Sequence, residues 1–132
     1  MKLTILFSLI LFSNTSRQNQ SDIDCTKFKN GNFSTHSELT NKTYSIIRKD
    51  SVQIESEKGT KKVSEWKLTW LNDCEYHILL VKDNYGLLKS GKLKRIPAFT
   101  YKIISTTDNY YIFENRYDNL KPSRIDTVWK VD

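Results

Sequence analysis

Residues 66–80 read WKLTWLNDCEYHILL, and this stretch decides the fold. Apolar and polar residues alternate on both sides of a short polar segment, which is the pattern of two half-buried β-strands joined by a turn. A shift of one residue would turn every apolar side chain to the other face, so the strands bury their apolar faces together only if Trp70 lies opposite Tyr76. This register needs a three- or five-residue loop centred on Asp73. It also gives two further pairs, Leu68 with Ile78 and Trp66 with Leu80.

Upstream of that hairpin, a similar alternation predicts two more strands. Ile46 lies on the apolar face of the first strand with Tyr44, and Ile54 lies on the apolar face of the second with Val52. A loop of odd length at residues 49–51 then pairs Ile46 with Ile54. A polar turn that contains a glycine leads on into the hairpin described above. These four strands therefore form an antiparallel meander.

Downstream, three more strands are predicted: one opened by Pro97, one at residues 111–113 and one at residues 125–131, with residues 118–124 as a loop. Their apolar faces are expected to hold Phe99, Tyr101 and Ile103, then Tyr111 and Phe113, then Ile125, Thr127, Trp129 and Val131.

A first strand near residues 28–35, bent at Gly31, brings the total to seven or eight. The fold class is all-β, and the short sequential links favour a small up-and-down antiparallel barrel or half-barrel, similar to lipocalins by analogy. A β-sandwich and an OB-like barrel are the alternatives.

The N-terminus has the pattern of an export signal. Lys2 is followed by the apolar run LTILFSLILF at residues 3–12, which would rise about 15 Å as a helix and is too short to span a membrane. We expect a signal peptide at residues 1–18, cleavage between Ser13 and Gln20, and one β domain at residues 19–132. The mature chain holds no transmembrane-length segment. It is expected in the periplasm or outside the cell.

Two cysteines remain after the signal. Asp24 precedes Cys25 where a lipidation site would want a small residue, so the sequence argues against a lipid anchor. In an exported chain, Cys25 and Cys74 favour a disulfide, worth about 4 kcal/mol in the chain-entropy model, over two independent thiols. Two Cys and two scattered His give no metal-ligand spacing, and no motif indicates a cofactor.

The charge of the chain is +6, and removal of Lys2 and Arg17 leaves about +4. Such a mildly basic domain does not by itself indicate a nucleic-acid partner, and export takes it away from most nucleic acid. One basic segment stands out: Lys89, Lys92, Lys94 and Arg95. It is interpreted as a solvated loop, with nucleic-acid or anionic-surface binding as the alternative.

No catalytic constellation is visible. His36 lies in a polar stretch and His77 on the polar face of its strand, so both are expected at the surface. The carboxylates are scattered, and several occupy turn positions. An envelope enzyme acting on a polymer or lipid would need these histidines and carboxylates to converge in a cleft.

Aromatic residues dominate the predicted inward faces. A small barrel that is not filled by its own side chains can hold an apolar ligand. The sequence favours a filled core over a lined cavity, and a non-catalytic module that binds a small apolar ligand or an envelope protein over an enzyme. The candidate core or binding aromatics are Trp66, Trp70, Tyr76, Tyr101, Phe113 and Trp129.

Three segments carry a family resemblance: CTKFKNGNF at residues 25–33, IRKDS at residues 47–51 with Gln53, and WLNDCEY at residues 70–76. Over residues 25–81 the chain resembles a group of short exported bacterial proteins of unknown role. The resemblance implies an export signal and a β-rich domain with paired cysteines. Some members carry a DNA topoisomerase label, but this chain is too short for that activity and shows no Tyr in a recognisable nucleophile context.

Overall fold

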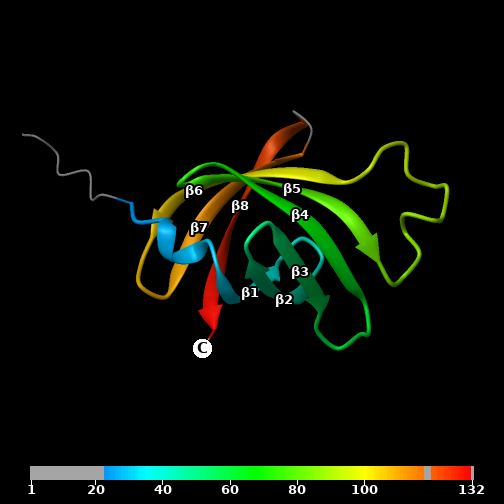
Figure 1. The fold of residues 1–132 in the computed structure, drawn as a ribbon, viewed down its shortest axis with the longest axis horizontal. Coiled ribbons are helices and arrows are strands. Elements are labelled where there is room, and N and C mark those ends of the chain that lie inside the picture. Colours follow the sequence, from blue (N-terminus) through cyan, green and yellow to red (C-terminus); the bar gives the residue numbers. More distant parts are fainter. Residues whose placement is uncertain (1–22, 118–119, 132) are drawn as a thin grey trace, which may run out of the picture.

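The computed structural model describes residues 23–117 and 120–131. The predicted export signal at residues 1–18, with its cleavage region, lies outside them. Within the described chain, one short 3₁₀-helix precedes eight strands (Figure 1). Their bounds are η1 Thr26–Phe28, β1 Gly31–Ser37, β2 Lys42–Lys49, β3 Val52–Glu57, β4 Val63–Asn72, β5 Glu75–Asp83, β6 Ala98–Thr106, β7 Tyr110–Tyr117 and β8 Leu120–Val131.

The strands form a closed up-and-down barrel, as the sequence predicted. Each strand is antiparallel to its neighbour in the chain, and β8 returns to pair with β1. Closure gives every strand a paired neighbour on both sides and places the inward faces of the strands around one interior. No helix in the described ranges is long and apolar enough to cross a membrane.

The β4–β5 hairpin has the predicted register. Trp70 lies opposite Tyr76, and the pairs Leu68–Ile78 and Trp66–Leu80 follow. The five residues between Trp70 and Tyr76 comprise a turn and a register shift between Trp70 and Asn72. A bulge adds one residue to one strand, which keeps both apolar faces directed inward.

The predicted register of the β2–β3 hairpin is wrong. Ile46 lies opposite Glu55, and the partner of Ile54 is Ile47. The turn is one residue shorter than expected, since Lys49 pairs with Val52 and Asp50 adopts a left-handed φ of 55°. Asp tolerates that conformation at little cost. The inward positions of β3 are consequently the polar ones, Gln53, Glu55 and Glu57.

Strand β8 also differs from the prediction. It begins at Leu120, within the segment expected to be a loop, and its inward residues include Val128, which lies opposite the buried Tyr111. Trp129 therefore faces outward, is 51% exposed and packs on the Tyr110 ring with centroids 4.6 Å apart. Alternation predicted which residues share a face, but barrel closure against β7 and β1 decided which face is inside.

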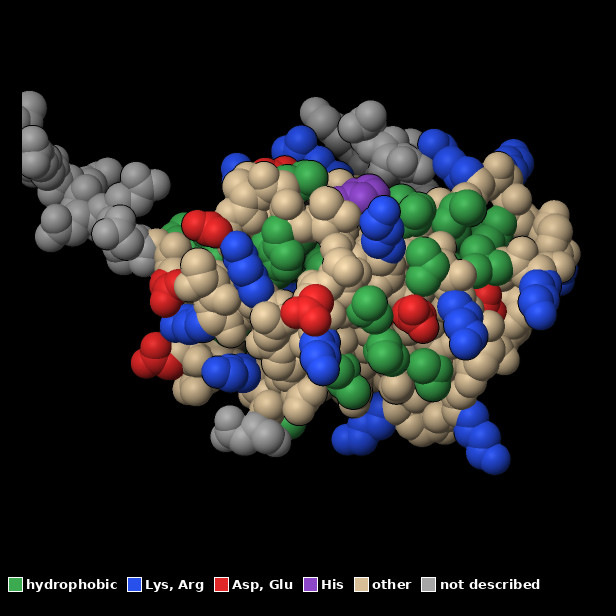
Figure 2. Space-filling model, viewed as in Figure 1, with side chains coloured by type: hydrophobic (Ala, Val, Ile, Leu, Met, Phe, Trp, Pro, Cys, Tyr) green, Lys and Arg blue, Asp and Glu red, His purple; other side chains and the backbone are tan. Residues whose placement is uncertain are grey.

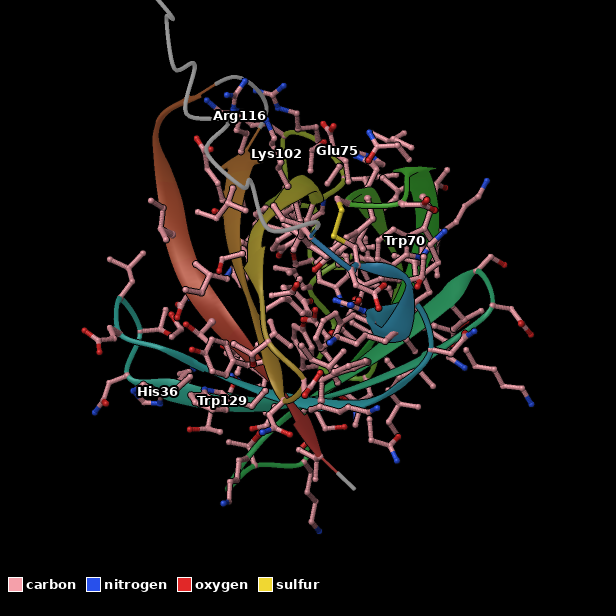
Figure 3. The ribbon with its side chains drawn as sticks, turned by 90° about the vertical axis from the view of Figure 1, so that its left-hand side faces the viewer. His36, Trp70, Glu75, Lys102, Arg116 and Trp129 are labelled. Atoms are coloured by element: carbon pink, nitrogen blue, oxygen red, sulfur yellow. A yellow bond between two sulfur atoms is a disulfide. The ribbon has the colours of Figure 1, made fainter. Side chains whose placement is uncertain are left out.

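One end of the barrel is closed by η1, at the position where the first strand was expected to begin. Phe28 is fully buried, and Cys25 forms the predicted disulfide with Cys74 in the β4–β5 turn. Lys29 pairs with Asp73 of the same turn at 2.7 Å. Figure 3 looks onto this end and shows the disulfide beside η1. We call residues 25–30 the plug.

The plug also contacts the other two turns at its end of the barrel. Lys27 pairs with Asp108 in the β6–β7 turn at 3.1 Å. The backbone N–H of Asp50, in the β2–β3 turn, donates to Asn30 Oδ1 at 2.8 Å. The plug therefore lies over this end of the barrel and is bonded to all three of its hairpin turns.

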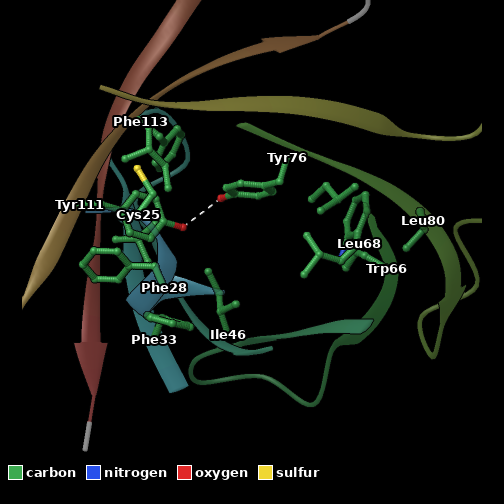
Figure 4. Close-up of a cluster of buried hydrophobic side chains, with 13 residues drawn as sticks. Cys25, Phe28, Phe33, Ile46, Trp66, Leu68, Tyr76, Leu80, Tyr111 and Phe113 are labelled. Carbon is green, nitrogen blue, oxygen red and sulfur yellow. Dashed lines mark hydrogen bonds between the residues drawn. The ribbon is translucent and has the colours of Figure 1, made fainter. Parts of the chain in front are cut away.

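The buried aromatic side chains are densest beside the plug. Figure 4 shows Phe28, Phe33, Tyr111 and Phe113 gathered on the plug side, with Trp66 on the opposite wall. The Phe28 and Tyr111 rings meet edge-on at 5.0 Å. Full burial of one such ring contributes roughly 1.5–3 kcal/mol, so this cluster is a major part of the core.

Candidate functional site

The barrel encloses a cavity of about 330 Å³ between the plug and the opposite end. Thr40, Lys62 and Tyr85 line it, and these residues come from the β1–β2, β3–β4 and β5–β6 connections, which all lie at the end away from the plug. The cavity is therefore open at that end. The sequence favoured a filled interior, and the structure corrects this: the plug half is filled, while short or polar inward residues such as Thr35 and Glu55 leave space above it.

Arg48 lies at the floor of the cavity and is 2% exposed. Its Nε donates to Gln53 Oε1 at 2.7 Å, and its Nη1 donates to the Phe28 carbonyl at 3.1 Å. Its Nη2 donates to the Tyr76 and Tyr111 hydroxyls at 2.7 and 2.6 Å. Four of the five guanidinium N–H groups are thus directed at neutral acceptors.

Aromatic rings enclose the same guanidinium. The Arg48 Cζ atom lies 4.5 Å from the centroid of Tyr76, 5.1 Å from Phe33 and 5.5 Å from Tyr111. Burial raises the pKa of Tyr76 well above its usual value, so its hydroxyl stays protonated, and it exchanges a 2.9 Å hydrogen bond with Tyr111 (dashed in Figure 4). Stacking and hydrogen bonds together hold a charged side chain in a low-dielectric site.

Glu55 carries a charge opposite to that of Arg48, and the Gln53 side chain lies between the two. Gln53 is buried between them: its Oε1 accepts from Arg48, and its Nε2 donates to Glu55 Oε1 at 2.7 Å. Glu55 is partly exposed because it borders the cavity. Burial in the barrel raises its pKa, although the hydrogen bond from Gln53 and the charge of Arg48 act in the other direction.

An arc of aromatic rings lines the wall of the cavity. Trp66 and Phe99 have centroids 5.9 Å apart, and Phe99 and Tyr101 follow at 6.3 Å. The indole Nε1 of Trp66 donates to Ser64 Oγ at 2.9 Å, so its polar atom is satisfied within β4. The wall therefore offers aromatic rings to whatever occupies the cavity.

The rim of the cavity is polar. Glu57 pairs with Lys42 at 3.1 Å, and Lys62 Nζ lies 5.8 Å from the centroid of Tyr85. The Asn84 side chain holds the start of the β5–β6 loop to the β3–β4 turn, accepting from the Val63 N–H and donating to the Lys61 carbonyl at 2.8 and 2.7 Å. These bonds hold the start of this loop, which carries Tyr85, beside the rim.

The structure brings together four of the six aromatics predicted for the core or a site. Those that line the cavity are Trp66, Tyr76, Tyr101 and Phe113. Trp70 packs on Tyr76 at 4.8 Å outside the cavity lining, with Lys29 of the plug 5.4 Å from its ring. Trp129 lies on the outer surface, so the prediction that it faces inward and belongs to the core is wrong.

The predicted basic segment lies in the β5–β6 loop, which projects from the barrel at the right of Figure 1. Its four side chains, Lys89, Lys92, Lys94 and Arg95, are exposed. The loop is anchored at Asp83, whose carboxylate accepts backbone N–H bonds from Tyr85, Leu87 and Leu88. Those bonds lower the pKa of Asp83, the bond from Leu88 most of all. Lys and Arg side chains are dispersed over the face shown in Figure 2.

The two histidines lie apart. His36 on β1 contacts Thr43 Oγ1 at 2.9 Å, and His77 on β5 contacts Thr100 Oγ1 at 3.1 Å. Strands β1 and β5 are four positions apart around a barrel of eight, so these side chains do not share a site. His77 borders a polar outer groove with Glu75, Lys102 and Arg116, which Figure 3 shows on a different side from His36.

Sequence patterning did not single out Arg48, Gln53 or Glu55. An odd-length turn before β3 directs the apolar Val52 and Ile54 inward and leaves the polar residues outside. The signal that identifies them is the turn itself, because an Asp that tolerates positive φ allows a two-residue connection, which reverses the faces of β3.

Comparison of the chain with models of protein families, curated proteins and solved structures gives no match. Over the ranges that the structure describes, no group of three or more His, Cys, Asp or Glu side chains is arranged to hold a metal ion.

Proposed function

We propose that this chain is an exported binding protein that holds a small molecule inside its barrel. The observation that carries the proposal is the cavity of about 330 Å³, closed by the plug and open at the far end. Its volume is at the lower end of the range typical of small-molecule sites. The disulfide is compatible with the oxidising compartment to which an export signal would direct the chain.

The composition of the interior supports binding over a purely structural role. A barrel interior that serves only folding would be filled by apolar side chains. Here the inward face of β3 carries Gln53, Glu55 and Glu57, and aromatic rings stand across the cavity from them. The cavity thus combines aromatic rings with several polar and charged side chains, which can fix the orientation of a bound molecule.

A fluorescent probe tests whether the cavity accepts a ligand. N-phenyl-1-naphthylamine is neutral and brightens in apolar surroundings, so titration with the purified protein should give a saturable rise. Thr35 lines the cavity, whereas its neighbour Ser34 faces outward. Thr35→Phe should therefore weaken probe binding at least about tenfold by occupying the cavity, while Ser34→Phe should bind as the unchanged protein does.

Thermal unfolding and far-ultraviolet circular dichroism should show both variants folded. Should Thr35→Phe fail to fold, Ser37→Phe and its outward control His36→Phe repeat the comparison, because Ser37 also lines the cavity. Equal probe binding by the inward and outward variants would contradict the proposal.

A further inference from the structure

Glu55 presents a carboxylate to the interior of the cavity. Its Oε1 accepts from Gln53 at 2.7 Å. Among the residues that the structure places, no Lys or Arg pairs with it directly. Desolvation of an ionised carboxylate is costly unless a hydrogen-bond donor or a cation faces it. The cavity therefore offers an acceptor whose strongest partner would be a positively charged group.

Arg48 does not offer the opposite charge to a ligand. Its guanidinium is 2% exposed, donates four hydrogen bonds and lies between aromatic rings. Gln53 stands between it and Glu55. A ligand that enters from the rim thus meets the carboxylate first and reaches the guanidinium only by breaking existing bonds.

Aromatic rings stand around that carboxylate. Glu55 lies opposite Ser64 on β4, and Trp66 lies two residues further on the same inward face. Tyr101 from β6 also lines the cavity, and it lies close enough that the Glu55 charge adds to burial in raising the pKa of its hydroxyl. Tyr85 from the β5–β6 loop lines the cavity near the rim. A carboxylate in a cavity that aromatic rings also line is an arrangement that suits organic ammonium groups.

We propose that the ligand is a small organic cation, an amine or quaternary ammonium whose nitrogen lies beside Glu55 and against the ring of Trp66. This inference rests on the proposed function and names its ligand class. A wholly apolar ligand would strip water from Glu55 and give it no partner, and an anion would bring a like charge to it. Of the cations near the rim, Lys42 and Arg124 already pair with Glu57 and Asp126, and Lys62 lies over the Tyr85 ring, 5.8 Å from its centroid.

Three ligands of the same shape test the inference by isothermal titration calorimetry. 1-Naphthylmethylamine is a cation at neutral pH, 1-naphthalenemethanol is neutral and 1-naphthoate is an anion. The amine should bind at least about tenfold more tightly than the alcohol, and the anion should bind most weakly, because only the amine supplies a charge opposite to that of Glu55. Equal affinities, or tighter binding of the alcohol or the anion, would overturn the inference.

Glu55→Gln should remove the preference for the amine and leave the affinity for the alcohol within about twofold, since the substituted amide keeps the size of the side chain. Glu65→Gln on the outward face of β4 is the matched control and should keep the full preference. A preference that survives Glu55→Gln would refute the role of Glu55. If Glu55→Gln does not fold, the comparison of the three ligands on the unchanged protein still tests whether the cavity prefers a cation.

The neutral probe separates this inference from the proposed function. Binding of N-phenyl-1-naphthylamine in the cavity without any preference for the amine would refute the cationic ligand and leave the binding protein standing. Failure of the probe and of all three naphthalene ligands to bind would refute both.

Discussion

Arg48 is a buried cation whose nearest acceptors are all neutral. It contacts Gln53, two tyrosine hydroxyls and one carbonyl, and the negative charge that compensates it, Glu55, lies beyond Gln53. Such an arrangement is sensitive to the loss of any member, because the remaining charge or hydroxyl would be left in a low-dielectric interior.

Replacing Arg48 should destabilise the barrel strongly. Arg48→Met removes the cation, leaves Gln53 Oε1 without its donor and leaves Glu55 uncompensated, so we expect the free energy of unfolding to fall by about 3–5 kcal/mol. Urea unfolding followed by tryptophan fluorescence measures the change. The exposed neighbour is the control: Lys49→Met should stay within about 0.5 kcal/mol of the unchanged protein. Equal stability of the two variants would contradict the role assigned to Arg48.

Glu55 makes stability depend on pH in a defined direction. Burial raises its pKa above the ordinary value of 4.5, so the folded state holds its proton to higher pH than the unfolded state. Glu55 therefore has little effect on the free energy of unfolding at a pH below 4.5. It lowers that free energy as the pH rises from there through its raised pKa in the folded state. The hydrogen bond from Gln53 and the charge of Arg48 oppose this shift and keep it smaller than burial alone would make it.

Glu55→Gln should remove that pH dependence. Relative to the unchanged protein, the variant should gain stability as the pH rises from about 4 to about 8, with little difference at the acidic end. Urea unfolding at a series of pH values, with Glu65→Gln as control, measures the gain. A stability difference between Glu55→Gln and the unchanged protein that does not vary with pH would show that Glu55 has an ordinary pKa.

At the scale of elements, the plug is the part that makes the two ends of the barrel different. It is held by one disulfide, two surface ion pairs and one backbone bond to three separate turns. Surface ion pairs contribute about 0–1 kcal/mol each, whereas a disulfide that closes a loop of 49 residues contributes more. The disulfide should therefore be the dominant tie of the plug.

Replacing both cysteines tests that ranking. Cys25→Ser with Cys74→Ser should lower the free energy of unfolding by about 2–4 kcal/mol, and hydrogen exchange at the Phe28 amide, which bonds the Cys25 carbonyl, should become faster. Lys27→Met with Lys29→Met should cost about 1 kcal/mol or less. A greater loss from the lysine pair than from the cysteine pair would reverse the ranking.

At the scale of the whole molecule, the sequence was sufficient for the fold class because successive strands alternate and are joined by short links. The pairs Trp70–Tyr76 and Leu68–Ile78 were predictable, since both strands have one strongly apolar face and only one register buries both. The disulfide between Cys25 and Cys74 was also predictable once export was assumed.

The candidate site was harder to predict, because alternation shows which residues share a face but not which face is inside. Strand β3 has apolar residues on one face and Gln53 and Glu55 on the other, and a turn shorter by one residue brings the polar face inward. The apolar character of Trp129 predicts an inward position, but closure of β8 against β7 turns its neighbour Val128 inward instead. Both errors concern strands whose inward residues a hydrophobic rule cannot identify.

The sequence by itself determined that these strands form a meander with its centre in residues 66–80, because local alternation and turn chemistry act between neighbours in the chain. Only the tertiary structure decided that Arg48, Gln53, Tyr76 and Tyr111 meet at the floor of a cavity. These residues come from strands whose side chains meet only when the barrel closes. Closure removes them from water, and in that low-dielectric interior a buried charge needs an opposite charge or hydrogen bonds to compensate it.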